Sequence, residues 1–183
     1  MTTTLKSGTY AIDPTHTNVE FAVKHLMIST VKGRFGDAKG TLEMPDIGEP
    51  RLDVTIAAAS IDTRVDARDT HLKSADFFDV AKYPELRFVS TGAVPTNDGW
   101  TLQGNLTMKG VTRPITLQVT FEGTAVDPWG NQKVAFMATG KLNRTDFGLT
   151  WNAALETGGV VVSEEVKLTF DVQLVKQAAA KAA

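Results

Sequence analysis

Apolar and polar residues alternate along most of this chain with a period of two, which is the side-chain period of a β-strand and not of a helix. Near the C-terminus, for example, Val166, Leu168 and Phe170 alternate with charged and hydroxyl side chains. Such alternation indicates strands with one buried and one solvent-exposed face, as in antiparallel sheets. The segments that show it are residues 9–13, 18–25, 51–58, 86–91, 100–108, 115–122, 133–142 and 165–174.

The lengths of these segments favour a closed barrel over a sandwich. Several run for eight to ten residues, whereas a typical strand has about five or six. The tilted strands of an elongated barrel accommodate such lengths. Turn-forming residues at 95–99, 109–114 and 127–131 separate successive runs, so we expect hairpin connections. The fold class predicted is all-β, a single antiparallel barrel of roughly eight strands.

One segment departs from simple alternation. Between residues 31 and 44 the apolar face moves from odd to even positions. Gly33, Gly36 and Gly40 lie within this segment. A change of phase accompanied by glycine predicts a bulge or a bend in a strand, and such bends help a sheet to close into a barrel.

Residues 62–73 are the one internal segment with a helical pattern. Asp62 and Thr63 are possible N-caps for it. An apolar stretch with two adjacent phenylalanines follows at 74–80. We expect a short helix and lid segment near 63–80, inserted between strands and covering one end of the barrel.

The chain shows no internal repeat and no linker, so a single domain is predicted. We expect a flexible N-terminus at residues 1–7, a β-barrel domain at 8–176 and an Ala-rich tail at 177–183. The tail has no apolar face that would hold it against the barrel.

Composition excludes several classes of protein. The absence of Cys excludes disulfides, thiolate catalysis and zinc–thiolate sites. The net charge is −2 and there is no basic run, which argues against a nucleic-acid partner. No stretch approaches the roughly 18 apolar residues of a membrane span, and the N-terminus lacks the apolar region of a secretory signal. We therefore expect a cytoplasmic protein.

Several local motifs resemble those of the YceI-like family. The most specific is RDTHLKSADFFD, from Arg68 to Asp79, followed by Tyr83-Pro84. The motifs occur in the family's order, and the resemblance covers about residues 8–176. The others are YAIDPTHTNVEF with VKH at 10–25, KGRF at 32–35, LTMKGVTRP at 106–114, NRTDFGL at 143–149 and EEVKL at 164–168.

The resemblance implies a lipocalin-like barrel whose lumen holds a long isoprenoid lipid of the polyprenyl or isoprenoid-quinone type. It implies a non-catalytic binding and transport protein, with the bound lipid as ligand, no other cofactor, and a possible homodimer. Many family members are periplasmic, whereas this sequence shows no signal peptide. The residues that we predict to line the lumen, from their inward parity and the Phe-rich composition, are Phe21, Val23, Phe35, Phe78, Phe88, Trp100, Leu102, Leu106, Met108, Leu117, Phe121, Phe136 and Phe170.

Neither metal-binding nor catalytic residues are predicted. His16, His25 and His71 show no i, i+4 spacing, and a hydrogen-bonded interior role is expected for His25. No serine lies in a Gly-x-Ser-x-Gly elbow. Two alternatives remain open, namely an enzyme that acts on a small lipid or quinone in the same cavity and a ligand-free stress-response protein.

Two groups of charged residues have simple structural interpretations. Arg64 and Arg68, with the aspartates around them, are expected to form a solvent-exposed helix face. The alternative is that they organise the lid and meet an anionic or quinone head group. Arg144 and Asp146 are expected to pair at a structural corner.

Overall fold

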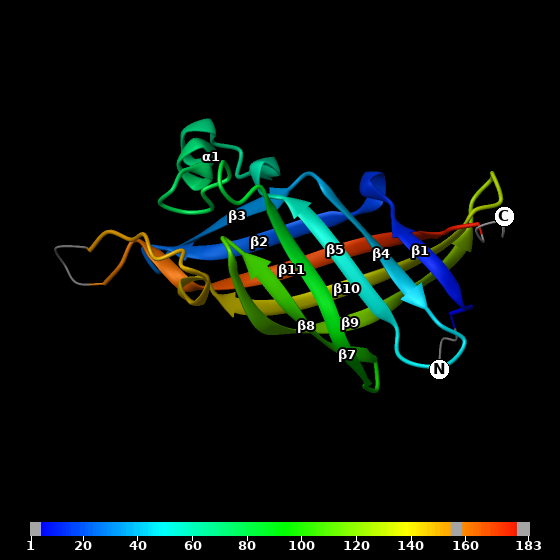
Figure 1. The fold of residues 1–183 in the computed structure, drawn as a ribbon. Coiled ribbons are helices and arrows are strands. Elements are labelled where there is room, and N and C mark those ends of the chain that lie inside the picture. Colours follow the sequence, from blue (N-terminus) through cyan, green and yellow to red (C-terminus); the bar gives the residue numbers. More distant parts are fainter. Residues whose placement is uncertain (1–4, 155–158, 179–183) are drawn as a thin grey trace.

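Eight antiparallel lengths of strand close into an elongated barrel in the computed structural model, which describes residues 5–154 and 159–178 (Figure 1). Hydrogen bonds link β1, β4, β5, β7, β8, β9, β10 and β11 in that order, and β1 also pairs with β11, which closes the ring. The predicted fold class is confirmed. The elements are β1 (Gly8–Ile12), β2 (Asn18–His25), β3 (Ser29–Phe35), β4 (Ala38–Met44), β5 (Arg51–Ala57), β6 (Ile61–Asp62), α1 (Asp66–Lys73), β7 (Glu85–Pro95), β8 (Gly99–Met108), β9 (Val111–Val126), β10 (Gln132–Asn143) and β11 (Val162–Lys176).

Parts of two sequence predictions cannot be compared with the structure. The predicted flexible N-terminus and Ala-rich tail fall largely on residues 1–4 and 179–183, which lie outside the described residues.

Three of the eight wall strands consist of two segments each. β1 and β2 both pair with β11 and are separated by a 3-10 turn, Pro14–His16. β4 and β3 together form the next wall strand, because β4 pairs with β1 and β3 pairs with β2. β5 and β6 form the wall strand after that, because β5 pairs with β4 and β6 pairs with β3. The phase change predicted between residues 31 and 44 coincides with the break between β3 and β4, at Gly36 and Asp37.

The prediction of a turn over the whole of 109–114 is wrong. The turn is confined to Lys109 and Gly110, which both have positive φ, and β9 begins directly after them. Pro114 therefore lies inside a strand. Among the described residues this part of β9 pairs only with β8, so the missing proline N–H does not interrupt a ladder on both sides.

The predicted helix is present, but the predicted N-caps, Asp62 and Thr63, are wrong. The helix begins at Asp66, and Val65 occupies the N-cap position without a side-chain cap. Thr63 instead donates hydrogen bonds from its backbone N and its Oγ1 to Asp69 Oδ1, at 2.9 and 2.5 Å. The segment before the helix is thus anchored to the middle of the helix.

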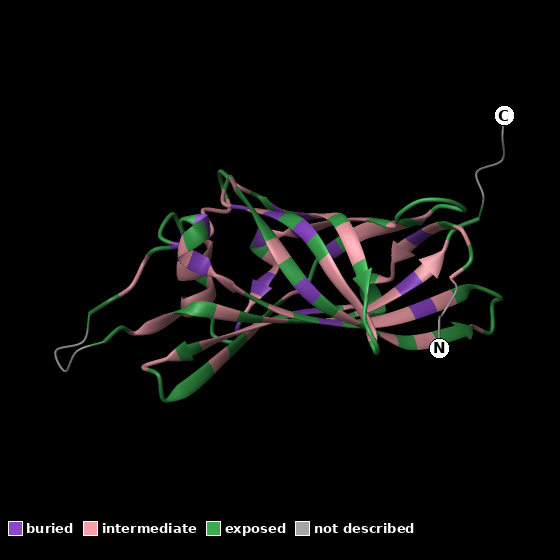
Figure 2. Ribbon diagram, turned by 90° about the horizontal axis from the view of Figure 1, so that it is seen from below, coloured by how far each residue is buried: buried purple, intermediate pink, exposed green. Residues whose placement is uncertain are grey.

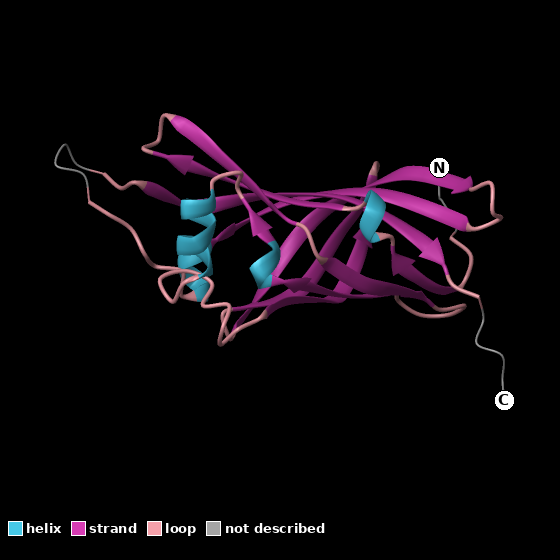
Figure 3. Cartoon of the chain, turned by 90° about the horizontal axis from the view of Figure 1, so that it is seen from above, coloured by secondary structure: helices cyan, strands magenta, loops and turns pink. Residues whose placement is uncertain are grey.

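Helix α1 and the segment after it cover one end of the barrel, as Figure 3 shows. We call this the α1 end. The turns between β2 and β3 and between β8 and β9 lie at this end, and Lys109 Nζ donates to the backbone oxygen of Ala75 at 2.9 Å. The opposite end carries the turns between β7 and β8 and between β9 and β10. The position of the lid segment therefore matches the prediction.

Burial alternates along the strands, as the sequence pattern predicts (Figure 2). Inward-facing residues such as Leu106 and Met108 are buried, while their chain neighbours Asn105 and Thr107 are more exposed. The larger buried cluster surrounds the lumen. A smaller cluster lies at the opposite end and consists of Tyr10, Val134 and Leu174.

Candidate ligand cavity

The lumen of the barrel is a cavity and not a filled core. It has a volume of about 770 Å³ and is bordered by side chains from all eight wall strands and from α1. Pockets for small molecules typically measure about 300–1,000 Å³, so the lumen has room for a ligand. All but eight of the bordering residues are apolar. The eight are Thr17, Glu20, His25, Thr63, Arg68, His71, Ser90 and Arg144.

Twelve of the thirteen side chains predicted to line the lumen border this cavity. Phe121 is the exception. Its ring packs on Phe136, with 5.8 Å between centroids, and against the Tyr10, Val134 and Leu174 cluster. The register between β9 and β10 shifts next to Phe121, which ends the regular inward alternation there. Whether the twelve others contact a ligand remains a prediction.

Glycines on the inner face of the wall give the cavity part of its width. Gly33 pairs with Phe21 across β2 and β3, and a Cβ at Gly33 would lie 2.4 Å from Phe21 Cζ. A Cβ at Gly104 would lie 2.2 Å from Phe88 Cζ. Each phenyl ring therefore occupies the space of a missing side chain and lies along the wall. Gly33, which we expected at a strand bend, instead lies within β3, where its missing side chain allows Phe21 to pack against the backbone.

Five of the eight polar lining residues, His25, Thr63, Arg68, His71 and Arg144, lie toward the α1 end. His25 ends β2 there, Arg68 and His71 lie on α1, and Arg144 directly follows β10. Arg68 donates from Nε to Thr63 Oγ1 at 2.7 Å and from Nη2 to Thr63 O at 2.9 Å. Arg68 is half-buried, so its predicted place on a solvent-exposed helix face is wrong. The charged and histidine side chains of the lining are therefore concentrated at the α1 end, with Glu20 as the exception.

Arg144 is the one charged residue in the buried class among the residues that the structure describes, with 4% of its surface exposed. Burial lowers the pKa of its guanidinium, but an arginine stays protonated in a protein. The predicted pairing with Asp146 is wrong, because the guanidinium of Arg144 is used for bonds to backbone oxygens instead. Nε, Nη1 and Nη2 donate to the carbonyl oxygens of Leu149, Trp151, Val162 and Ser163.

These four bonds tie the loop after β10 to the beginning of β11. Their acceptors are main-chain atoms, which every residue type possesses, so the sequence carries no signal for them. This explains why sequence reasoning missed the role of Arg144. Because Arg144 also borders the cavity, the bonds place a fixed positive charge at its α1 end.

A cluster of three rings packs at the α1 end. His71, Phe77 and Trp151 pack mutually, with centroid separations of 5.1 Å (His71 to Phe77), 4.8 Å (His71 to Trp151) and 5.3 Å (Phe77 to Trp151). His71 Nε2 lies 2.9 Å from Asp76 Oδ2, which fixes the imidazole plane. Within the described residues, no three His, Cys, Asp or Glu side chains come together in a metal-binding group.

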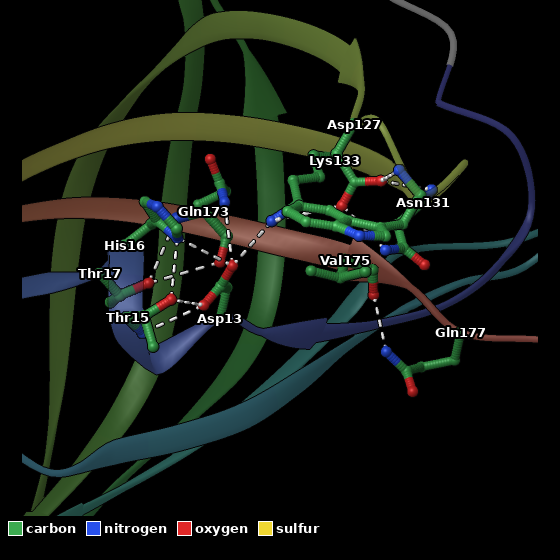
Figure 4. A network of polar contacts seen from close by, with 11 residues as sticks. Asp13, Thr15, His16, Thr17, Asp127, Asn131, Lys133, Gln173, Val175 and Gln177 are labelled. Atoms are coloured by element: carbon green, nitrogen blue, oxygen red, sulfur yellow. Dashed lines mark hydrogen bonds and ion pairs between the residues drawn. The ribbon is translucent and has the colours of Figure 1, made fainter.

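A second polar cluster lies outside the cavity, where β1 gives way to β2 (Figure 4). Asp13 accepts hydrogen bonds from Thr15, from Lys133 Nζ at 3.0 Å and from Gln173 Nε2 at 3.0 Å, and His16 Nδ1 lies 3.1 Å away. The bonds from Thr15, and then those from Lys133 and His16, hold the pKa of the Asp13 carboxyl well below its usual range. The cluster fastens the 3-10 turn to β10 and β11.

Comparisons with known proteins agree with this architecture. The YceI-like domain family matches residues 10–174. A UPF0312 protein of Staphylococcus aureus is 39% identical over 161 residues, which is 86% of this chain and 92% of that protein. No helix in the described part of the chain is long and apolar enough to cross a membrane.

Solved structures share the fold. The crystal structure of a Campylobacter jejuni YCEI protein superposes with a TM-score of 0.72 at 33% identity, covering 85% of this chain and 90% of that one. A polyisoprenoid binding domain from Saccharophagus degradans, only 16% identical, superposes with a TM-score of 0.70 over 94% of this chain and 100% of that one. With its barrel, its lid segment and the match over residues 10–174, the chain belongs to the YceI-like family.

Proposed function

We propose that the protein is a non-catalytic carrier that holds a long isoprenoid lipid, of the polyprenyl or isoprenoid-quinone type, in its barrel. The observation that carries this proposal is the cavity of about 770 Å³ whose lining is apolar except for eight residues. An isoprenoid chain offers no polar atoms along its length, so it needs apolar walls and no fixed hydrogen-bonding partners. Each buried CH₂ group contributes about 0.8 kcal/mol.

The two ends of the cavity suggest how the lipid lies. Arg68, His71 and Arg144 border the α1 end, whereas Tyr10, Val134 and Leu174 pack the opposite end. A head group that accepts hydrogen bonds is better placed near the two arginines, since buried polar atoms need partners. The tail then extends toward the apolar end. The fold shared with the polyisoprenoid binding domain supports a ligand of this shape.

The direct test is extraction of the purified protein with organic solvent, followed by mass spectrometry. We expect a prenyl lipid in near-stoichiometric amount. A protein that is empty and also fails to take up added polyprenol or isoprenoid quinone would show that the proposal is wrong. Recovery of the added lipid in chemically altered form would instead favour the enzyme alternative.

A pair of variants on one strand separates lining from packing. Ala138 points inward and borders the cavity, whereas its neighbour Met137 points outward. Ala138→Phe should fill the middle of the lumen and lower lipid uptake per folded molecule by about tenfold or more, because several CH₂ groups lose their place. Met137→Phe is the matched control and should bind lipid as the wild type does.

The resemblance to the family also implies a homodimer, and we carry this forward as an expectation. Sedimentation velocity of the purified protein with and without lipid measures it. A monomer in both conditions would remove the dimer from the proposal and leave the carrier function as it stands.

A further inference from the structure

The turn between β2 and β3 has an unusual combination of backbone and side chains. Leu26 and Met27 both have positive φ, at 52° and 60°, and the backbone N of Ile28 donates to the backbone oxygen of His25 at 3.2 Å. Positive φ at both central residues is the geometry of a type I′ turn, which strongly prefers Asn-Gly, and here it lies within a three-residue connection between the paired residues His25 and Ser29. Two consecutive large apolar residues are a strained choice here, and such strain is typically kept where it serves a function.

The same turn exposes its apolar side chains. Met27 is 64% exposed and Ile28 is 83% exposed. Next to them, the backbone N of Leu26 donates to Val161 O at 2.8 Å, and Val160, which precedes that residue, is also exposed. We call Leu26, Met27, Ile28 and Val160 the apolar tip. In Figure 1 the β2–β3 hairpin reaches the same end of the barrel as α1.

The apolar tip is continuous with the cavity. His25, directly before the turn, and Val161, directly after Val160, both border the cavity. Val65, at the start of α1, borders it too and is an exposed residue, so the cavity approaches the surface at this end. An apolar molecule that moves between the lumen and an apolar phase outside would thus stay beside apolar side chains.

Three lysines lie on the outer face close to the tip. Lys24 and Lys32 belong to the hairpin itself, and both Lys32 and Lys167 are aligned with Ala22, from opposite sides. All three lysines are exposed, and among the described residues none of them forms an ion pair. Lys24 Nζ bonds only a hydroxyl, that of Thr30, at 3.0 Å. This arrangement places three exposed lysines close to the apolar tip.

From this geometry we infer that the apolar tip inserts into an anionic lipid bilayer, with Lys24, Lys32 and Lys167 facing the lipid head groups, and that the cavity exchanges its ligand there. The inference rests on the proposed function. Exposed apolar side chains combined with lysines are the pattern by which proteins bind the surface of anionic membranes. A bilayer is an apolar phase from which a long isoprenoid can enter the barrel.

The opposite end provides the contrast. Trp129 is 83% exposed in the turn between β9 and β10, but that turn has regular chemistry. Gly130 occupies the positive-φ position, and Asp127 accepts hydrogen bonds from the backbone N of Trp129 and of Asn131. Exposure there comes without backbone strain.

The test is co-sedimentation with vesicles of phosphatidylcholine and phosphatidylglycerol in equal parts, compared with vesicles of phosphatidylcholine alone. Met27→Gly/Ile28→Thr removes apolar area, supplies glycine for positive φ and keeps a β-branched residue directly before β3. We expect this variant to bind anionic vesicles about tenfold more weakly, with an unfolding midpoint equal to or above that of the wild type. Val126→Thr/Trp129→Ser, at the opposite end, is the matched control and should bind as the wild type does.

Replacing Lys24, Lys32 and Lys167 by Gln should weaken binding to anionic vesicles by about fivefold for each lysine. Uptake of isoprenoid delivered in solvent should stay unchanged in all variants. A wild type that ignores anionic vesicles, or a tip variant that binds them normally, overturns the inference while leaving the proposed function intact. If the wild type fails to take up isoprenoid delivered in solvent, the proposed function itself is wrong.

Discussion

Two polar clusters fasten segments of this barrel to one another, and each stabilises a largely covered charge in a different way. The carboxylate of Asp13, with 12% of its side chain exposed, forms an ion pair with Lys133 and accepts hydrogen bonds from neutral donors. Arg144, with 4% of its surface exposed, uses only main-chain carbonyl oxygens. The first cluster fastens the turn between β1 and β2 to β10 and β11, and the second ties the loop after β10 to the beginning of β11.

The difference lies in what can switch each cluster off. The Asp13 cluster depends on an ionised carboxyl, so acid weakens it. The Arg144 cluster depends on a guanidinium that does not titrate and on carbonyls that cannot, so only mutation or unfolding removes it. The stabilisation from the Asp13 cluster is therefore pH-sensitive, whereas that from the Arg144 cluster is not.

The largest effect is expected from Arg144→Met. It keeps much of the side-chain volume but removes the side-chain donor from the carbonyl oxygens of Leu149, Trp151 and Ser163, while Val162 O keeps its bond from Asn152 Nδ2. The loss should lower the free energy of unfolding by about 3–5 kcal/mol. Urea unfolding followed by circular dichroism measures it. Arg113→Met, on the exposed part of β9, is the control, with an expected change within about 0.5 kcal/mol. Similar stabilities for the two variants would contradict the role given to the carbonyl bonds.

Asp13→Asn should have a smaller effect that depends on pH. At neutral pH the loss of charge-assisted bonds should cost about 1–2 kcal/mol. The pKa of Asp13 is lower in the folded protein than in the unfolded chain, where it is near 3.9. The stabilisation is therefore complete above that value and is lost as the pH falls below it toward the folded pKa.

The measurement is the difference in unfolding free energy between wild type and Asp13→Asn at pH 7 and near pH 3. We expect the difference to shrink on acidification. The corresponding difference for Arg144→Met should change much less over the same interval. If both differences fall in parallel, the contrast between the two clusters is not one of titration.

The smallest effect is expected from Lys133→Met. Asp13 retains its bonds from Thr15 and Gln173, so the loss should be about 0.5–1 kcal/mol. Because part of this interaction is between charges, added salt should reduce the difference from the wild type. Unfolding at low and high sodium chloride concentration measures it, and a difference that salt leaves unchanged would show that Lys133 acts mainly through packing.

Most of the fold follows from local pattern. The alternation over 18–25 predicts β2, and the same reasoning identifies the other long wall strands, because each strand must bury one face. The inward parity of Phe35, Leu106 and Phe170 likewise places them at the cavity. Period and parity are local properties, so the sequence displays them directly.

What the sequence could not predict depends on contacts between distant segments. Arg144 bonds to the backbone oxygens of Leu149, Trp151, Val162 and Ser163. Every residue type has such an oxygen, so the sequence does not indicate which residues are the partners. Phe121 has inward parity, but the register shift beside it is decided by how β9 meets β10. The apolar turn at Leu26 and Met27 opposes local turn preferences, so local rules point away from the structure there.

The glycines behind the phenyl rings of Phe21 and Phe88 affect the width of the cavity. Gly33 and Gly104 have no side chain to contact a ligand, but a single methyl group at either would displace the phenyl ring of Phe21 or Phe88, both of which border the cavity. The width of this cavity is therefore set in part by positions that contribute no side chain to its lining.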